Sequence, residues 1–152
     1  MYDIHVKVDG QVENILQGLM SRLGNLKPAT RLMGEIVLES IVTNFEQGGR
    51  PGKWDPLAAA TIRQRQRKGK WPGRILVQSG HAGGLLGAIA YTPGDTSVTI
   101  HANKRYARIH HYGGQAGKGH KTTIPARPYM MVQDEDWEDI RAGLNDYILG
   151  GK

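Results

Sequence analysis

Apolar residues recur at intervals of three and four along two stretches in the first third of the chain. One stretch covers residues 12–23 and stops at Gly24, and the other begins after Pro28 and continues to Gln47. This spacing places apolar side chains on one face of an α-helix, and glycine commonly follows the last helical turn. The pattern therefore predicts a helix over residues 12–23 and a longer helix between Pro28 and Gln47.

Two further helices are indicated by the residues at their first turns. Asp55-Pro56 supplies a capping acceptor and a proline suited to the first helical position, ahead of the helix-forming residues 57–68. Residues 134–149 begin with acidic side chains, which the helix dipole favours at that end, and carry an apolar stripe from Trp137 onward. We expect a third helix that starts at Asp55-Pro56 and a terminal helix that packs against the core through Trp137.

Alternation of apolar and polar residues predicts short strands elsewhere. Residues 4–8 alternate in this way, and residues 88–92 and 98–100 flank a Pro-Gly-Asp turn, which is typical of a β-hairpin. Residues 79–87 are too short and too rich in glycine to be assigned to helix or strand, whereas residues 113–122 predict a flexible surface loop. These elements predict a single α+β domain, in which a small, mainly antiparallel sheet packs against three to four helices.

Positive charge is concentrated in the middle of the chain, which has 152 residues and a net charge of +6. Residues 1–49 carry four Lys/Arg against six Asp/Glu, residues 50–128 fourteen against two, and residues 129–152 two against six. The middle segment should attract phosphates or an acidic surface, unless folding places the acidic terminal segments beside it.

Several protein classes are disfavoured by what the sequence does not contain. It has no run of about 18 apolar residues and no charged-then-apolar leader, so we expect neither a membrane span nor secretion. It has no cysteine, which excludes disulfides and thiolate metal sites. We therefore expect a protein made and kept in the cytoplasm, with no membrane partner.

Histidines and a glycine-lysine segment are the candidates for chemistry. Gly114 and Gly119 have the spacing of a phosphate-binding loop, but His120 stands where that motif needs lysine. The six histidines lack a zinc-binding helix motif, and no carboxylate lies between Asp95 and Asp134 to support a metal site. We predict no catalytic residue, metal ion or cofactor. A small metal-dependent hydrolase ranks third, behind the two functions considered below, because it rests on the histidines alone.

A basic segment within residues 50–74 predicts an alternative function, which is sequence-independent binding of nucleic acid. On a continuous helix Arg63, Arg67 and Lys70 would share one face, which suits contacts to phosphates without sequence readout. A solvated helix face explains the same charges, so both interpretations stay open. The candidate contacts, with Trp71 among them, are Arg63, Arg65, Arg67, Lys68, Lys70 and Arg74.

Three segments in this order resemble the phage virion morphogenesis family, the tail-completion proteins of long-tailed phages and Mu-like prophages. They are residues 45–61 (FEQGGRPGKWDPLAAAT), 106–113 (YARIHHYG) and 124–129 (IPARPY), followed by the terminal helix with its acidic start. The resemblance covers roughly residues 10–149. The positions that match the family's motifs are Trp54, Leu57, Leu76, Leu85, Tyr106, His110, Gly113, Pro125, Arg127 and Pro128.

The resemblance implies a structural, non-enzymatic protein that completes or terminates the phage tail and helps to join it to the head. The precedent of tail terminators and connectors implies a ring, with a hexamer as the expected form, so the implied partners are further copies of the chain and tail-tube and head-tail connector proteins. The basic middle segment would face either DNA in the lumen or an acidic partner. The implied location is the cytoplasm of the bacterial host during assembly and then the virion.

The matching residues suggest how such a protein would make its contacts. Pro125 and Pro128 impose an extended backbone around Arg127, which would present its guanidinium to a carboxylate, a carbonyl or a neighbouring subunit. Together with Arg127, the candidates for an assembly interface are Pro125, Pro128, Tyr106, His110, Gly113 and Trp54.

Overall fold

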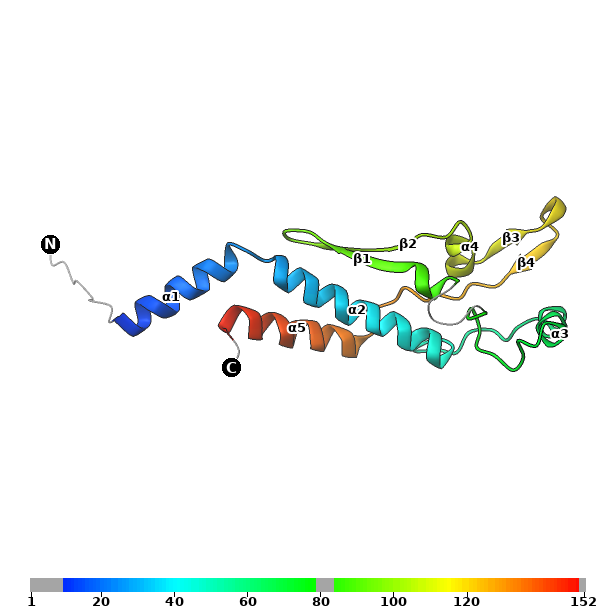
Figure 1. Cartoon of the computed structure of the whole chain (residues 1–152), viewed down its shortest axis with the longest axis horizontal. Coiled ribbons are helices and arrows are strands. Elements are labelled where there is room, and N and C mark those ends of the chain that lie inside the picture. Colours follow the sequence, from blue (N-terminus) through cyan, green and yellow to red (C-terminus); the bar gives the residue numbers. More distant parts are fainter. Residues whose placement is uncertain (1–9, 79–83, 151–152) are drawn as a thin grey trace.

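The fold is an elongated arrangement of helices and two short β-hairpins. The computed structural model describes residues 10–78 and 84–150, and α1 lies at one end of the molecule with α3 and the β3–β4 hairpin at the other (Figure 1). The helices are α1 (Gly10–Leu23), α2 (Lys27–Gln47), α3 (Ala59–Arg67), α4 (Ala107–Tyr112) and α5 (Asp134–Leu149), with 3-10 turns η1 (Leu86–Ala88) and η2 (Lys118–His120). The strands are β1 (Ile89–Pro93), β2 (Val98–Ala102), β3 (Gly114–Ala116) and β4 (Thr122–Ile124).

Helix α2 is the central element of the fold. It packs against α5 on one side and against the β1–β2 hairpin on the other (Figure 1). Ile41 and Phe45, one turn apart on α2, are fully buried beside Tyr129 in the core. The three-four spacing of apolar residues therefore predicted both the helix and the face that it buries.

Both hairpins are antiparallel and form separate two-stranded sheets. In the first, Ile89 pairs with Ala102 and Pro93 with Val98, which confirms the predicted hairpin. In the second, Gly114 pairs with Ile124 across residues where the sequence predicted a loop. The predicted loop is thus partly a hairpin, since β3 and the first residue of β4 fall within residues 113–122; the flexibility of this segment stays a prediction.

Helix α1 projects away from the rest of the molecule (Figure 1). Its apolar side chains are largely exposed, and Met20 reaches 73%. Its last turn contacts α5, where Arg22 Nη1 donates to the carbonyl of Ile148 at 3.2 Å and the Tyr147 hydroxyl donates to the carbonyl of Asn25. The helix was predicted correctly, and the strand predicted over residues 4–8 lies outside the described residues.

Helix α3 begins later than the sequence predicted. The prediction placed its start at Asp55-Pro56, but the first helical residue is Ala59 and no side chain caps the helix. The carbonyls of Asp55 and Pro56 accept hydrogen bonds from Arg127 instead of turning into the helix. A contact 71 residues away in sequence therefore overrides the local start signal.

Helix α5 was predicted correctly, but it does not pack through Trp137. That side chain is 45% exposed, whereas Ile140 is 3% exposed and belongs to the core. The buried carboxylate of Asp136 accepts hydrogen bonds from the backbone N–H of Gln133 and from Ser40 Oγ, which turns the Asp136 face of the first turn toward α2. Trp137 follows one residue later, about 100° around the helix, and points outward.

The close approach of α5 to α2 depends on a glycine. A Cβ atom at Gly143 would lie 2.5 Å from Leu32 Cδ2, so a larger residue would push the two helices apart. The overall class is a single α+β domain, as predicted, with helices packed against small antiparallel sheets. Within residues 10–78 and 84–150 no helix is long and apolar enough to cross a membrane.

Candidate functional site

The proline-flanked segment at residues 125–129 is held by backbone hydrogen bonds to three other parts of the fold. The N–H of Arg127 donates to the carbonyl of His110 at 2.9 Å. The carbonyl of Pro128 accepts from Trp54 Nε1 at 3.1 Å, and the carbonyl of Tyr129 accepts from Asn44 Nδ2 at 3.1 Å. The segment therefore joins α4, the chain before α3, and α2.

Arg127 is buried at 5% exposure and uses its guanidinium inside the subunit. Its Nε and Nη2 donate to the carbonyl of Asp55 at 3.3 and 3.1 Å, and Nη2 also donates to the carbonyl of Pro56 at 3.3 Å. Burial lowers the pKa of Arg127, nearby Asp55 opposes that shift, and nearby Arg65 adds to it. The sequence predicted a carboxylate, a carbonyl or a neighbouring subunit as the partner of this guanidinium. Within the subunit the guanidinium bonds to carbonyls, and these bonds fix the chain leading into α3.

The three motif segments meet around a cavity of about 560 Å³, which we call the motif cavity. Arg127 lies in its wall, together with Arg65 from α3 and His110 from α4. The site therefore brings together three residues that are 17 to 62 positions apart in sequence. Other residues at family-motif positions that line the motif cavity are Leu57, Leu76, Leu85, Tyr106 and Pro125.

His110 and His111 occupy different surroundings on α4. His110 lines the motif cavity, and its ring packs edge-on against that of Tyr106 with centroids 5.7 Å apart. His111 packs edge-on against Tyr129 at 5.1 Å. Burial lowers the pKa of both imidazoles, and for His110 the nearby Arg127 lowers the pKa further. Among residues 10–78 and 84–150, no three His, Asp or Glu side chains gather to hold a metal ion.

Trp54 and Gly113 shape the scaffold around the cavity. The Trp54 ring is buried edge-on against Phe45, with centroids 5.7 Å apart. Gly113 follows α4 with φ of 73°, and a Cβ atom there would lie 2.8 Å from the backbone nitrogen of Ala126. Only glycine lets α4 end this close to residues 124–126.

Arg65 corrects one of the candidate nucleic-acid contacts. It is 5% exposed, its Nη1 donates to the carbonyl of Arg74 at 2.8 Å, and burial lowers its pKa. The predicted face of Arg63, Arg67 and Lys70 is also wrong, because α3 ends at Arg67 and Lys70 follows it. The side chains that stay exposed in this segment are Arg63, Arg67, Lys68, Lys70, Trp71 and Arg74, the last of which pairs with Glu46 at 3.4 Å.

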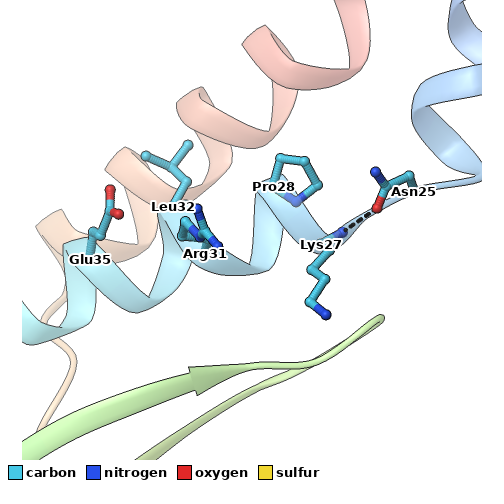
Figure 2. Close-up of a pocket in the computed structure, with 6 residues that line it drawn as sticks. All are labelled: Asn25, Lys27, Pro28, Arg31, Leu32 and Glu35. Atoms are coloured by element: carbon cyan, nitrogen blue, oxygen red, sulfur yellow. Dashed lines mark hydrogen bonds between the residues drawn. The ribbon is translucent and has the colours of Figure 1, made fainter.

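A second hollow, of about 310 Å³, lies along the start of α2 and the residues before it (Figure 2). It is lined by Asn25, Lys27, Pro28, Arg31, Leu32 and Glu35. Figure 2 shows the Leu32 side chain pointing toward α5, while the Lys27 N–H is bonded to Asn25 Oδ1 at 3.3 Å. None of the motif positions lines this hollow, so the motif cavity is the stronger candidate site.

Comparison with known proteins identifies the family to which the three motif segments belong. The sequence profile of the phage virion morphogenesis family matches residues 8–148, which include all three motif segments. The chain belongs to this family. A Haemophilus influenzae protein named Mu-like prophage FluMu G protein 2 is 30% identical over 148 residues, which cover 97% of this chain and 96% of the relative. The putative capsid assembly protein G of Escherichia phage Mu is 30% identical over 142 residues, covering 91% and 89% of the two chains.

Membership of the virion morphogenesis family gives the protein a structural role in making phage particles and associates it with the virion. No solved structure matches this chain. The residues at family-motif positions serve two purposes in this fold. Trp54 and Gly113 set backbone packing, whereas Tyr106, His110, Pro125 and Arg127 also face the motif cavity.

One buried polar cluster of this family member was not singled out from the sequence. Arg50 Nε donates to Asn44 Oδ1 at 2.8 Å, and its Nη2 donates to Ser40 Oγ at 2.6 Å. Its Nη1 pairs with Glu135 at 2.9 Å, and its Nη2 lies 3.9 Å from Asp136. The signal was present in the helix pattern, because Ser40 and Asn44 fall at core-facing positions of α2 and are polar.

The two partly buried histidines of α4 predict how stability changes with pH. Because their pKa values are lower in the folded protein than the usual 6.5, the unfolded chain takes up protons first as the pH falls. The free energy of unfolding should therefore decrease between pH 6.5 and the folded pKa values, by up to about 1.4 kcal/mol for each unit of lowering. Urea unfolding at pH 7.5 and 5.5 measures this change. His111→Phe keeps a ring against Tyr129 and should reduce the difference; an equal difference in parent and variant would contradict the explanation.

Proposed function

We propose that this protein is a structural subunit that completes the phage tail and helps to join it to the head, acting as a ring of copies. Family membership supplies the structural role, and the 30% identity to a protein named for capsid assembly supports a place in the assembled particle. Further copies of the chain, the tail tube and the head-tail connector are its partners in this proposal. Its activity is assembly, without catalysis.

The observation that carries the ring is the difference between the two parts of the elongated molecule. One end holds α3 with its exposed cations, whereas α5 runs from the middle of the molecule away from α3 and carries the exposed acids Asp134, Glu135, Glu138 and Asp139 (Figure 1). Arg50 is the residue of the basic middle segment that pairs with α5, while Arg63 and Arg67 lie on α3. Opposite charges at different places on one subunit favour head-to-tail contacts, and such contacts close into a ring when the rotation between neighbouring copies is a whole fraction of a turn.

The first experiment is light scattering coupled to size exclusion, across protein concentration and at low and high salt. We expect a discrete oligomer near a hexamer. Charge reversal at Arg63→Glu and Arg67→Glu should dissociate it, reversal at Glu138→Lys and Asp139→Lys should do the same, and the combined variant should recover it. A monomer under every condition, including mixtures with purified tail tubes, would overturn the proposal and leave DNA binding by the exposed α3 cations as the alternative to test.

A further inference from the structure

Two buried polar atoms belong to side chains that line the motif cavity. Arg65 Nε and His110 Nδ1 are buried, and neither has a hydrogen-bond partner among the described residues. A buried donor without a partner is uncommon and costs free energy, most of all on a charged group. Arg65 is 5% exposed and its side chain lines the cavity, so a small shift of the guanidinium would bring Nε to a ligand bound there.

The charge of the motif cavity is positive and uncompensated by its walls. Arg65 and Arg127 both line it, and none of the described residues that line it is an Asp or Glu. Residues 79–83 contain no acidic residue in their sequence either. The Arg127 donors Nε and Nη2 bond to backbone carbonyls, which are neutral acceptors. An anion in this cavity would therefore meet two guanidinium groups in surroundings where charge interactions are stronger than in water.

The remaining walls combine apolar residues with neutral polar ones, namely three threonines and two glutamines, and so limit which anion fits. Leucines from three parts of the chain and an isoleucine from β4 surround the charged groups, namely Leu57, Leu76, Leu85 and Ile124. An acidic side chain brings methylene groups that match such walls, and a planar carboxylate suits a guanidinium fork. A nucleic-acid phosphate carries a sugar on each side and is usually bound by exposed cations. This chain carries exposed cations elsewhere on α3, so the cavity suits a carboxylate better than a nucleic-acid phosphate.

We propose that the motif cavity is a carboxylate-binding site that receives an acidic side chain from a partner protein chain during particle assembly. Arg65 Nε donates to one carboxylate oxygen, and His110 Nδ1 donates to the ligand when that nitrogen carries a proton. Arg127 holds the chain at Asp55 and Pro56 and contributes its positive charge. The nature of the ligand follows from the cavity itself, whereas the identification of its source as a protein of the particle rests on the proposed function.

Titration of ¹⁵N-labelled protein with glutarate tests the site, with sodium chloride used to keep the ionic strength constant. We expect saturable shifts of the Arg65 Nε–H and His110 ring resonances, with a dissociation constant on the order of 10 mM for so small a ligand. Sodium chloride and inorganic phosphate serve as comparison anions. No saturable shift with glutarate, or a stronger response to phosphate, would overturn carboxylate recognition.

Three variants separate recognition from folding. Arg65→Lys keeps the charge but removes the Nε–H, and it should weaken glutarate binding about tenfold, the value of one charge-assisted hydrogen bond. Thr61→Phe fills the cavity from α3 without changing a cation, so it should also block glutarate binding. This variant tests the site independently should Arg65→Lys fail to fold. Arg67→Lys on the exposed part of α3 is the matched control and should bind as the parent does. Parent-like binding by Arg65→Lys and Thr61→Phe would refute the site.

The source of the carboxylate is assigned by adding excess glutarate to the assembled oligomer. Dissociation would identify a second copy of the chain as the donor, and an intact oligomer with glutarate bound would identify another protein of the particle; both results support the site. Glutarate binding does not require a ring, so its failure would leave the tail-completion proposal standing. A monomer that binds glutarate would instead retain the cavity and remove the ring.

Discussion

Arg50→Ala is expected to lower the free energy of unfolding by about 3–5 kcal/mol, which is the usual range for breaking a buried ion pair. The Arg50 side chain is 13% exposed and joins α2 to the first turn of α5 through Asn44, Ser40 and Glu135. Its removal would leave the buried carboxylate of Asp136 beside fewer donors and free the loop that leads to Trp54. Urea unfolding followed by circular dichroism measures the loss.

A surface arginine provides the control for Arg50→Ala. Arg141 pairs with Glu138 on the exposed side of α5, where both side chains are more than half exposed. Such pairs contribute about 0.5 kcal/mol or less, so Arg141→Ala should leave stability nearly unchanged. Similar small losses for both variants would show that the Arg50 cluster is dispensable and that α2 and α5 are held by apolar packing alone.

Phe45→Ala should cost about 3–5 kcal/mol, whereas Trp137→Ala should cost about 1 kcal/mol. The Phe45 ring is fully buried between Trp54 and Tyr129, at centroid distances of 5.7 and 5.3 Å, and no solvent can enter the space it leaves without crossing the core. Trp137 is the larger residue but lies 45% exposed on α5. Urea unfolding of both variants compares them directly, and a greater loss for Trp137→Ala would place the core on the wrong face of α5.

The sequence was sufficient where neighbours along the chain determine structure. The spacing around Ile41 and Phe45 predicted α2 and its buried face, and the turn at Gly94 predicted the first hairpin. It was insufficient where distant residues decide. The start of α3 depends on the Arg127 guanidinium, which donates to the carbonyls of Asp55 and Pro56, and no local propensity contains that contact.

The outward position of Trp137 shows the same limit within one helix. Apolar periodicity assigned it to the core, but the buried polar group at Asp136 set the rotation of α5 by bonding to Ser40 on α2. Propensity and periodicity treat Asp136 as a surface residue, since an acidic side chain is normally solvated. Its burial becomes predictable only when the partner on another helix is known.

The candidate site was predictable residue by residue but not as a cavity. Family resemblance selected Tyr106, His110 and Arg127, and all three line the motif cavity. Arg65 belongs to the same wall, yet its sequence neighbours made it look like one more cation of an exposed helix. Burial separates Arg65 from Arg63 and Arg67, and burial is a property of the fold.

The first turn of α1 and the last turn of α5 point toward the same end of the molecule, away from α3 and the β3–β4 hairpin (Figure 1). Fluorophores or gold particles attached at the last turn of α5, which lies beside the last turn of α1, would consequently mark the half of each subunit that lies away from α3. In electron micrographs of labelled particles, their radius and height would report the direction in which the subunit's long axis runs relative to the tail.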